Sequence, residues 1–332
     1  MEIRWMLNFF KLAILSLLLV SNTAFAKVYD CFMFFNEYDI LDIRFHELYD
    51  HVDHFVIVES CEGHAGLPKE FNFEKNKEMY AQFLDKVIYI KLHERQTTGD
   101  PWIREHYQRN QIMRGLVNCG PEDVIFISDC DEIMEKEIIQ ETVEALNQHK
   151  VVLFKPRIWS EWCLNRVIDS PNVHGVNHPA YNLFAKDFDR IKKLQENFGQ
   201  RDLPGIWGAM VAVKYKDLVP VTPQLLRDLR HVKPVTEIQR DYPYFVSCYK
   251  VSGWHFSNMG GHRTVRNKME NWAHSYDPGG NPGGGSDSFD HQGWWNAHKS
   301  GNSLAPIDEY YPQYVQDNID YFIQRGLIDP YE

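Results

Sequence analysis

The stretch at residues 123–134, DVIFISDCDEIM, decides the fold of this chain. Its first half is a run of β-branched and aromatic residues, which is typical of a buried strand. Its second half places three carboxylates, Asp129, Asp131 and Glu132, within four positions. Because like charges this close repel one another, packing alone does not explain them. Either the acids are solvated turn residues, or a positive group lies among them.

The segments around this stretch alternate between strand and helix patterns. Strands are predicted at residues 28–35, 54–59, 86–92, 123–128 and 151–156. Helices are predicted at residues 39–49, 70–84, 101–117 and 135–148, the third with Asp100 as its N-cap and Pro101 at its first position. Almost uninterrupted apolar strands joined by helices predict a parallel sheet covered on both faces, a Rossmann-like α/β layer.

The overall charge restricts the class of ligand. The 332 residues carry 35 Lys and Arg against 46 Asp and Glu, a formal net charge of −11. A nucleic-acid binder needs a basic stripe, so this balance argues against one. An acidic surface also repels a free nucleotide. A nucleotide site in this chain therefore requires local Arg or Lys side chains or a bound cation.

The N-terminus has the pattern of an export signal. Arg4 and Lys11 precede and flank an apolar run, LAILSLLLV, and an A-x-A pattern ends at Ala26. Residues 1–26 are therefore predicted to be a secretory signal peptide. The alternative is an uncleaved signal anchor at residues 5–26, which would associate the protein with a membrane. Either way the remainder is expected outside the cytosol, in a bacterial periplasm or extracellular space or in a Golgi-type lumen.

The remainder, residues 27–332, is expected to form one domain in two halves. Residues 27–157 contain the alternating pattern, and residues 158–332 are more irregular and rich in Trp, Gly and Pro. Exposed Trp rings are good platforms for sugars, although Trp is also an ordinary core residue. The second half is therefore a candidate carbohydrate-binding region.

Polar residues stand at the ends of the predicted strands, where α/β sheets bind ligands. Asn36 follows the first strand, Glu59 ends the second, and Asp129 and Asp131 follow the fourth. A D-x-D pair supplies the oxygen ligands that Mg²⁺ or Mn²⁺ takes together with substrate phosphates. Phosphatases of the haloacid-dehalogenase type carry a related motif after their first strand, and the later position here disfavours them. In the helix at residues 101–117, Arg104 and Arg109 either border this site or pair internally.

Three stretches resemble, in order and spacing, the glycosyltransferases of family 17. They are FMFFNEYDILDIRFHELYDHVDHFVIVES, REHYQRNQI and DVIFISDCDEI, and a later Gly-Trp-His block at residues 253–255 is similar. The likeness covers residues 28–275 and is strongest before residue 160. One departure is Asn110, where an acid is expected in the helix.

The resemblance implies a metal-dependent, inverting transferase with a GT-A fold that moves N-acetylglucosamine from UDP-GlcNAc to a glycan or glycoprotein, as in N-glycan processing. Residues 27–157 would bind the nucleotide sugar and residues 158–332 the acceptor. Asp129 and Asp131 would hold Mn²⁺ or Mg²⁺ and the diphosphate, and Glu59 would meet the uridine. His255 is a candidate third metal ligand or phosphate contact. Its alternative is a ring packed beside its neighbour Trp254.

Inversion by a single displacement requires a base that takes the acceptor proton. The candidates are Glu132, Glu161 and Asp202, and the sequence does not choose among them. Two other functions remain open: an exported carbohydrate-binding protein with a vestigial metal site, and a metal-dependent phosphoesterase.

Overall fold

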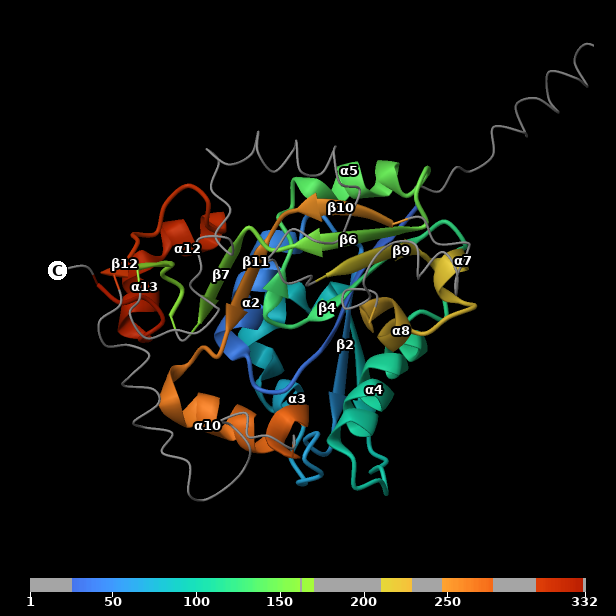
Figure 1. Cartoon of the computed structure of the whole chain (residues 1–332), viewed down its shortest axis with the longest axis horizontal. Coiled ribbons are helices and arrows are strands. Elements are labelled where there is room, and N and C mark those ends of the chain that lie inside the picture. The colour runs from blue at the N-terminus through green and yellow to red at the C-terminus, as the bar shows by residue number, and fades with distance from the viewer. Residues whose placement is uncertain (1–25, 162, 170–209, 229–246, 277–302, 331–332) are drawn as a thin grey trace, which may run out of the picture.

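The computed structural model describes residues 26–161, 163–169, 210–228, 247–276 and 303–330. These residues form a seven-stranded sheet in the order β10-β6-β9-β4-β1-β2-β3 (Figure 1). Its strands are β1 (Val28–Met33), β2 (His54–Ser60), β3 (Val87–Leu92), β4 (Val124–Asp129), β6 (Val151–Lys155), β9 (Val211–Lys214) and β10 (Ser247–Val251).

Most of this sheet is parallel, as the sequence predicts. Strand β1 runs parallel to β2 and β4, β2 to β3, and β10 to β6. The exception is β9, which is antiparallel to both β4 and β6 and lies between them. Pattern analysis did not find this strand, because it comes from the irregular second half of the chain. The predicted α/β class is confirmed, with a mixed sheet instead of a wholly parallel one.

Helices cover both faces, because successive residues of each central strand point to opposite sides. In β1, Val28 and Phe32 face one core, whereas Tyr29 and Cys31 face the other. The first core receives α2 (Tyr38–Leu48), α3 (Asn72–Asn76), the 3-10 helix η1 (Lys77–Lys86) and α5 (Ile138–Ala145). The second receives η2 (Gln111–Gly115), α7 (Tyr215–Leu218) and α8 (Pro223–Asp228), while α4 (Pro101–Asn110) lies beside α8.

The predicted helices are present, with α2 shifted by one residue and α5 shorter than the helix predicted at residues 135–148. The helix predicted at residues 70–84 is α3 followed by η1, with a kink at Tyr80. The one predicted at residues 101–117 is α4 followed by η2. Its predicted start is confirmed, since the Asp100 carboxylate accepts a hydrogen bond from the Trp102 backbone N–H at 2.9 Å.

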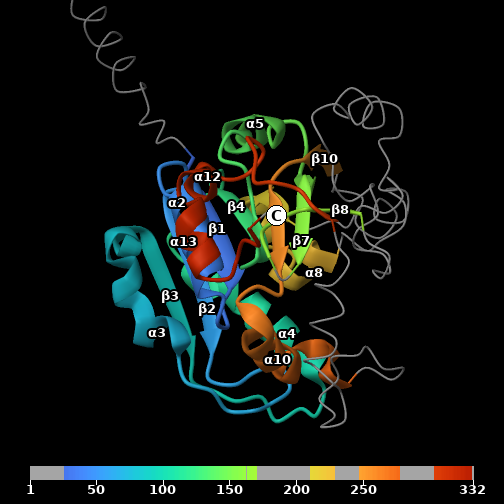
Figure 2. The same cartoon turned by 90° about the vertical axis from the view of Figure 1, so that its left-hand side faces the viewer.

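The C-terminal segment packs against α2 (Figure 2). It contains α12 (Gln313–Asp317) and α13 (Ile319–Gln324). Tyr314 stacks on His46 with ring centroids 3.7 Å apart and donates a hydrogen bond to Asp42. The C-terminal segment therefore joins the core on the face of the sheet that α2 covers. Residues 1–25, which include the predicted signal, lie outside the described residues. No helix within the described ranges is long and apolar enough to cross a membrane.

A second, smaller sheet connects the end of β4 to the second half of the chain. It has the order β5-β11-β7, from β5 (Glu132–Ile133), β11 (Trp254–Ser257) and β7 (Ile158–Glu161). Strand β11 places His255 opposite Glu132. It then leads into α10 (Gly261–Asn271) and the 3-10 helix η4 (Ala273–Tyr276). A separate short pair joins β8 (Val167–Asp169) to β12 (Ser303–Leu304).

The turn that leaves β4 is held by a buried arginine on α2. Arg44 is 1% exposed, and its Nε donates to Asp30 Oδ2 of β1 at 2.7 Å. Its Nη2 also donates to Asp30 Oδ1. Further hydrogen bonds go to the carbonyl oxygens of Asp129 (2.9 Å), Cys130 (3.1 Å) and Glu132 (2.9 Å) and to Ser128 Oγ (2.7 Å). Arg44 therefore fixes the backbone of residues 129–132, which we call the acidic turn.

We expect Arg44→Met to lower the free energy of unfolding by about 3–5 kcal/mol, because it leaves the Asp30 charge buried without its partner. The matched control is Arg325→Met, which removes a half-exposed pair with Asp39 of the same helix. An exposed pair contributes at most about 1 kcal/mol. Urea unfolding measures both values. Equal losses in the two variants would show that Arg44 does not organise the fold.

Gly253, which immediately precedes β11, sets the approach of that strand to β5. Its φ is +87°, and a Cβ there would lie 2.1 Å from the carbonyl oxygen of Ile133. Gly261→Ala tests the conformational cost alone, about 1–2 kcal/mol, because its φ is +80° with open space around it. Gly253→Ala should cost more than Gly261→Ala, and Gly99→Ala should cost almost nothing. Thermal unfolding of the three variants in any other order would contradict this role for Gly253.

Candidate functional site

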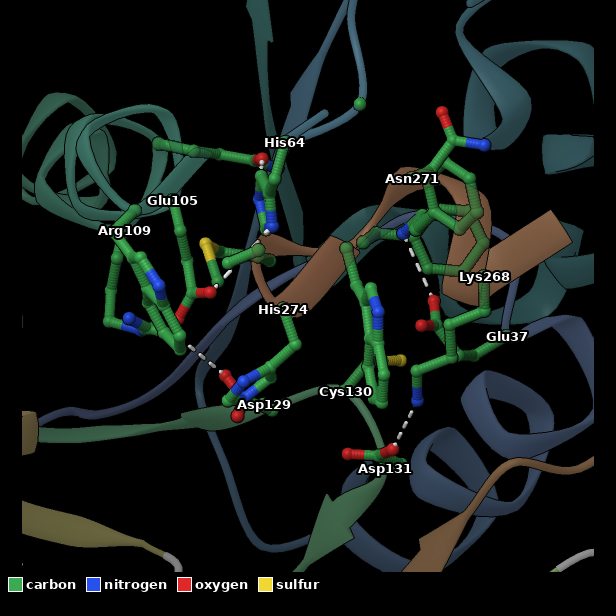
Figure 3. Close-up of a pocket in the computed structure, with 18 of the residues that line it drawn as sticks. Glu37, His64, Glu105, Arg109, Asp129, Cys130, Asp131, Lys268, Asn271 and His274 are labelled. Atoms are coloured by element: carbon green, nitrogen blue, oxygen red, sulfur yellow. Dashed lines mark hydrogen bonds and ion pairs between the residues drawn. The ribbon is translucent and has the colours of Figure 1, made fainter. Parts of the chain in front are cut away.

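A pocket of about 750 Å³ opens at the carboxyl ends of β1, β2 and β4 (Figure 3). Residues after β1, after β2 and in the acidic turn form its floor. Helix α4 lines one side, and α10 with η4 lines another. α/β sheets bind ligands at this edge, and the sequence predicted that polar residues would lie there. The walls come from both halves of the chain.

The carboxylate of Asp129 is clamped by two arginines. Its Oδ1 accepts from Arg109 Nη2 at 2.9 Å, and its Oδ2 accepts from Arg227 Nη2 at 2.6 Å. Arg109 lies on α4 and also donates to Glu105 at 2.9 Å. The sequence left open whether Arg109 borders the site or pairs within its helix. It does both, because it pairs with Glu105 and also lines the pocket. Arg227 comes from α8 and was not identified from the sequence.

Two groups from the second half of the chain surround Asp131. Lys268 Nζ of α10 donates to Asp131 Oδ2 at 2.9 Å. His255 Nε2 of β11 lies 3.6 Å from Asp131 Oδ1. Burial opposes ionisation of this carboxyl, but the charges of Lys268 and His255 outweigh it and lower the pKa of Asp131 below its usual value. Asp131 is therefore ionised. Its pairing with Lys268 and His255 offsets the repulsion between the neighbouring acids of this turn.

Glu132 supports the turn from beneath. It is 1% exposed, and its Oε1 accepts from Arg227 Nη2 at 2.5 Å. Its Oε2 accepts from the backbone N–H of Asp129 at 2.8 Å. Both oxygens are thus engaged within the protein. This environment suits a group that shapes the acidic turn, and it argues against the predicted use of Glu132 as a base.

The residues predicted to hold a divalent cation separate into two environments. Asp131 and His255 direct an oxygen and a ring nitrogen toward each other, which fits a pair of ligands to one ion. Asp129 does not share this arrangement, since each of its oxygens meets an arginine. Within the described ranges no group of three or more His, Cys, Asp or Glu residues could hold a metal. Mg²⁺ needs only one or two carboxylates when phosphates complete its shell, so Asp131 can supply such a ligand. His255 could add its Nε2 only as a neutral ring, which means that the ion would replace the proton paired with Asp131.

Glu59 lies near the end of β2, as predicted, but its carboxylate meets the start of α3 instead of the pocket. Its side chain is fully buried and caps the start of α3, accepting from the backbone N–H groups of Asn72 (2.6 Å) and Phe73 (3.0 Å). Tyr89 Oη and Lys69 Nζ also donate to it, at 2.7 and 2.5 Å. Four donors therefore occupy this carboxylate, and it does not line the pocket in the described part of the chain. The predicted contact with uridine is not supported.

Two further predicted residues lie beside the pocket rather than on its wall. Asn36 lines a small cavity of about 30 Å³ that shares Asp131 and Lys268 with the main pocket. Arg104 points to the loop that follows β2, donating to the carbonyl oxygen of His64 at 3.1 Å and to that of Thr98. Arg104 therefore shapes the pocket wall through a loop and makes no direct contribution to it.

The other two candidate bases are only partly located. Glu161 is the last residue of β7, and in the register of the small sheet it pairs with Ser257, which lines the pocket. Asp202 lies outside the described residues. Sequence reasoning also did not assign Glu37, which lines both cavities and accepts from the backbone N–H groups of Phe35 and Asn36 at 3.0 Å. Burial raises the pKa of Glu37.

Lys268 and Arg227 are the cations paired with the acidic turn that the sequence did not reveal. Neither lies in a motif, and each stands on a helix of the divergent second half. The only available signal was indirect. Three adjacent acids after a buried strand require cations, and the sequence does not say which of its many Lys and Arg residues provide them.

Comparison with known proteins agrees with the sequence resemblance over the first half of the chain. The model of glycosyltransferase family 17 matches residues 19–151. The human β-1,4-mannosyl-glycoprotein 4-β-N-acetylglucosaminyltransferase is 36% identical over 110 residues, 31% of this chain and 21% of that protein. The rat protein of the same name gives 36% identity over 31% of this chain and 20% of its own length. The matched segment is about a fifth of the length of these relatives.

Among solved structures the likeness is distant. The structure of S. aureus TarS, residues 1–349, has 14% sequence identity and a TM-score of 0.36, and the match covers 74% of this chain and 66% of that one. Its complex with UDP-GlcNAc gives 12% identity, a TM-score of 0.35, and 74% and 67% coverage. The similarity to glycosyltransferases therefore rests on the sequence comparisons and not on these structures. The resemblance to glycosyltransferase family 17 is confirmed for the segment at residues 19–151, which includes the acidic turn.

Proposed function

We propose that this protein is an inverting glycosyltransferase with a GT-A-type fold that transfers N-acetylglucosamine from UDP-GlcNAc to a glycan acceptor. One observation carries the proposal. The segment similar to family 17 ends in the acidic turn and the helix after it, and this turn lines the pocket of about 750 Å³ at the edge of the sheet where α/β folds bind ligands. The names of the relatives supply the transferred sugar.

The cations of the pocket support a nucleotide diphosphate as the donor when a metal ion is also bound, because seven carboxylates and three Lys or Arg residues of the described chain line it. The chain has a net charge of −11, so an anionic ligand needs local cations. Arg109 and Lys268 line the pocket, and Arg227 lies directly behind Asp129. We propose that these cations, together with the backbone of the acidic turn, receive the UDP moiety.

Asp131 and His255 are the proposed ligands of Mn²⁺ or Mg²⁺. When bound, such an ion would neutralise the negative charge that develops on the departing UDP. Asp129 has a separate role in the proposal. By pairing with Arg109 and Arg227 it holds one cation on the pocket wall and another directly behind the floor, where they can stabilise the same developing charge.

In the proposed reaction the acceptor hydroxyl oxygen attacks the anomeric carbon as the bond from that carbon to the UDP oxygen breaks. The hydroxyl proton passes to a carboxylate base, and UDP leaves with the bonding electrons. Glu132 is engaged by Arg227 and by a backbone N–H. Glu161 is the better candidate, because β7 places it opposite the pocket residue Ser257. Asp202 remains the other predicted base.

The acceptor is proposed to be a glycan or glycoprotein that the exported protein meets outside the cytosol. An N-glycan core and a bacterial surface glycan are the two acceptor classes to test. An array of both, incubated with the full chain, Mn²⁺ and radiolabelled UDP-GlcNAc, identifies the acceptor. The same assay separates the other functions. A carbohydrate-binding protein retains glycans without affinity for UDP, and a phosphoesterase releases phosphate without transferring sugar.

Asp131→Asn should reduce both sugar transfer and the slower hydrolysis of UDP-GlcNAc by about 100-fold or more, the order seen when a charge-stabilising group is removed. The control Asp50→Asn removes one negative charge from an exposed turn and should retain full activity. Initial rates with labelled donor measure both. Full activity of Asp131→Asn would refute the proposed site.

Glu161→Gln should lower the turnover rate by about 10²–10⁴-fold while leaving the affinity for UDP unchanged, because a general base acts on the acceptor. Glu270→Gln, on the outer part of α10, is the control. Transfer kinetics and calorimetric titration with UDP provide the two measurements. A normal turnover rate in Glu161→Gln assigns the base to another residue, with Asp202 next to be tested.

A further inference from the structure

Lys268 holds the carboxylate that the proposed divalent cation also requires. Its Nζ lies 2.9 Å from Asp131 Oδ2, while His255 Nε2 lies 3.6 Å from Oδ1. The ammonium group and the ion would therefore approach the two oxygens of one carboxylate. Like charges at such separations repel strongly where water is partly excluded, and the Asp131 side chain is only 8% exposed.

The attachment of Lys268 differs from that of the two arginines. Arg109 is fixed by Glu105 and Asp129, and Arg227 by Asp129 and Glu132. Within the described residues Lys268 donates one hydrogen bond, to Asp131. A lysine ammonium is a point charge on a flexible stem, whereas an arginine bound by two carboxylates is constrained by its planar fork. Lys268 is therefore the cation of this site that can change partner.

The surroundings of Lys268 offer it a place beside an incoming anion. Its side chain is 21% exposed and lines both the main pocket and the small cavity next to it. Glu37, from the loop after β1, lines the same two cavities and interacts electrostatically with Lys268. An ammonium group between Glu37 and Asp131 can turn toward the pocket without leaving a negatively charged environment.

We propose that Lys268 is an exchangeable counterion that makes the binding of the divalent cation depend on the nucleotide. It occupies Asp131 until a nucleoside diphosphate enters, and it then pairs with the diphosphate and leaves Asp131 to the metal ion. This inference rests on the proposed function. It adds a coupling between the binding of the nucleotide and the binding of the metal ion. Without the nucleotide, the protein would bind free metal ions weakly.

The test is a titration of the full chain with Mn²⁺, in the absence and in the presence of saturating UDP. The EPR signal of the free ion measures how much Mn²⁺ is bound. In the wild type, UDP should tighten Mn²⁺ binding. In Lys268→Met the affinity for Mn²⁺ alone should rise at least about fivefold, and the coupling with UDP should shrink, since couplings between ligands typically span about 5- to 150-fold. Lys268→Arg, which keeps the charge, should bind Mn²⁺ alone as weakly as the wild type.

The control is Arg266→Met, which removes one positive charge from the exposed side of the same helix. It should leave both affinities unchanged. The predicted gain in Lys268→Met also distinguishes the mechanism from damage to the fold, which would weaken Mn²⁺ binding. An unchanged or lower affinity of Lys268→Met for Mn²⁺ alone overturns the inference. If the wild type binds no UDP, the proposed function fails with it. If UDP binds with the same coupling in both proteins, only the inference fails.

Discussion

The buried ion pair between Arg44 and Asp30 is the interaction on which the arrangement of the site depends. It joins α2 to β1, and the same guanidinium holds three carbonyl oxygens of the acidic turn. A turn with three adjacent carboxylates is unstable by itself, because its charges repel. With its backbone fixed from beneath, the side chains of Asp129 and Asp131 can each be directed to separate cations.

Those cations come from different parts of the chain, and this gives the second half its role. Arg109 lies on the helix before β4, whereas Arg227, His255 and Lys268 follow residue 210. The acids of the family-like segment are therefore neutralised only in part by residues outside it. In the proposed function a bound divalent cation completes the neutralisation, so that a chain with a net charge of −11 can accept an anion in this pocket. Strand β9 also comes from the second half of the chain, and it lies beside β4, the strand that leads into the acidic turn.

Local patterns predicted the first half of the fold well. Apolar runs identified β1 to β4, and Asp100 with Pro101 identified the start of α4, because these signals depend on neighbouring residues. Strand β9 was missed because it is only four residues long and lies in an irregular region. In the site, Asp129 and Asp131 were located from their position after a strand. The burial of Glu59 beneath α3, and the pairing of Lys268 with Asp131, depend on contacts between distant segments that no local pattern contains.

The central claim is that Asp131 and His255 bind a divalent cation beside the diphosphate of a nucleotide sugar, while Asp129 stays with its arginines. A crystal structure of the protein with Mn²⁺ and UDP, in which the ion is located by its anomalous scattering, tests this most directly. We expect one anomalous peak within bonding distance of Asp131 and His255, with Asp129 still paired to Arg109 and Arg227. A peak bonded to Asp129, or an ion remote from Asp131, would contradict the account.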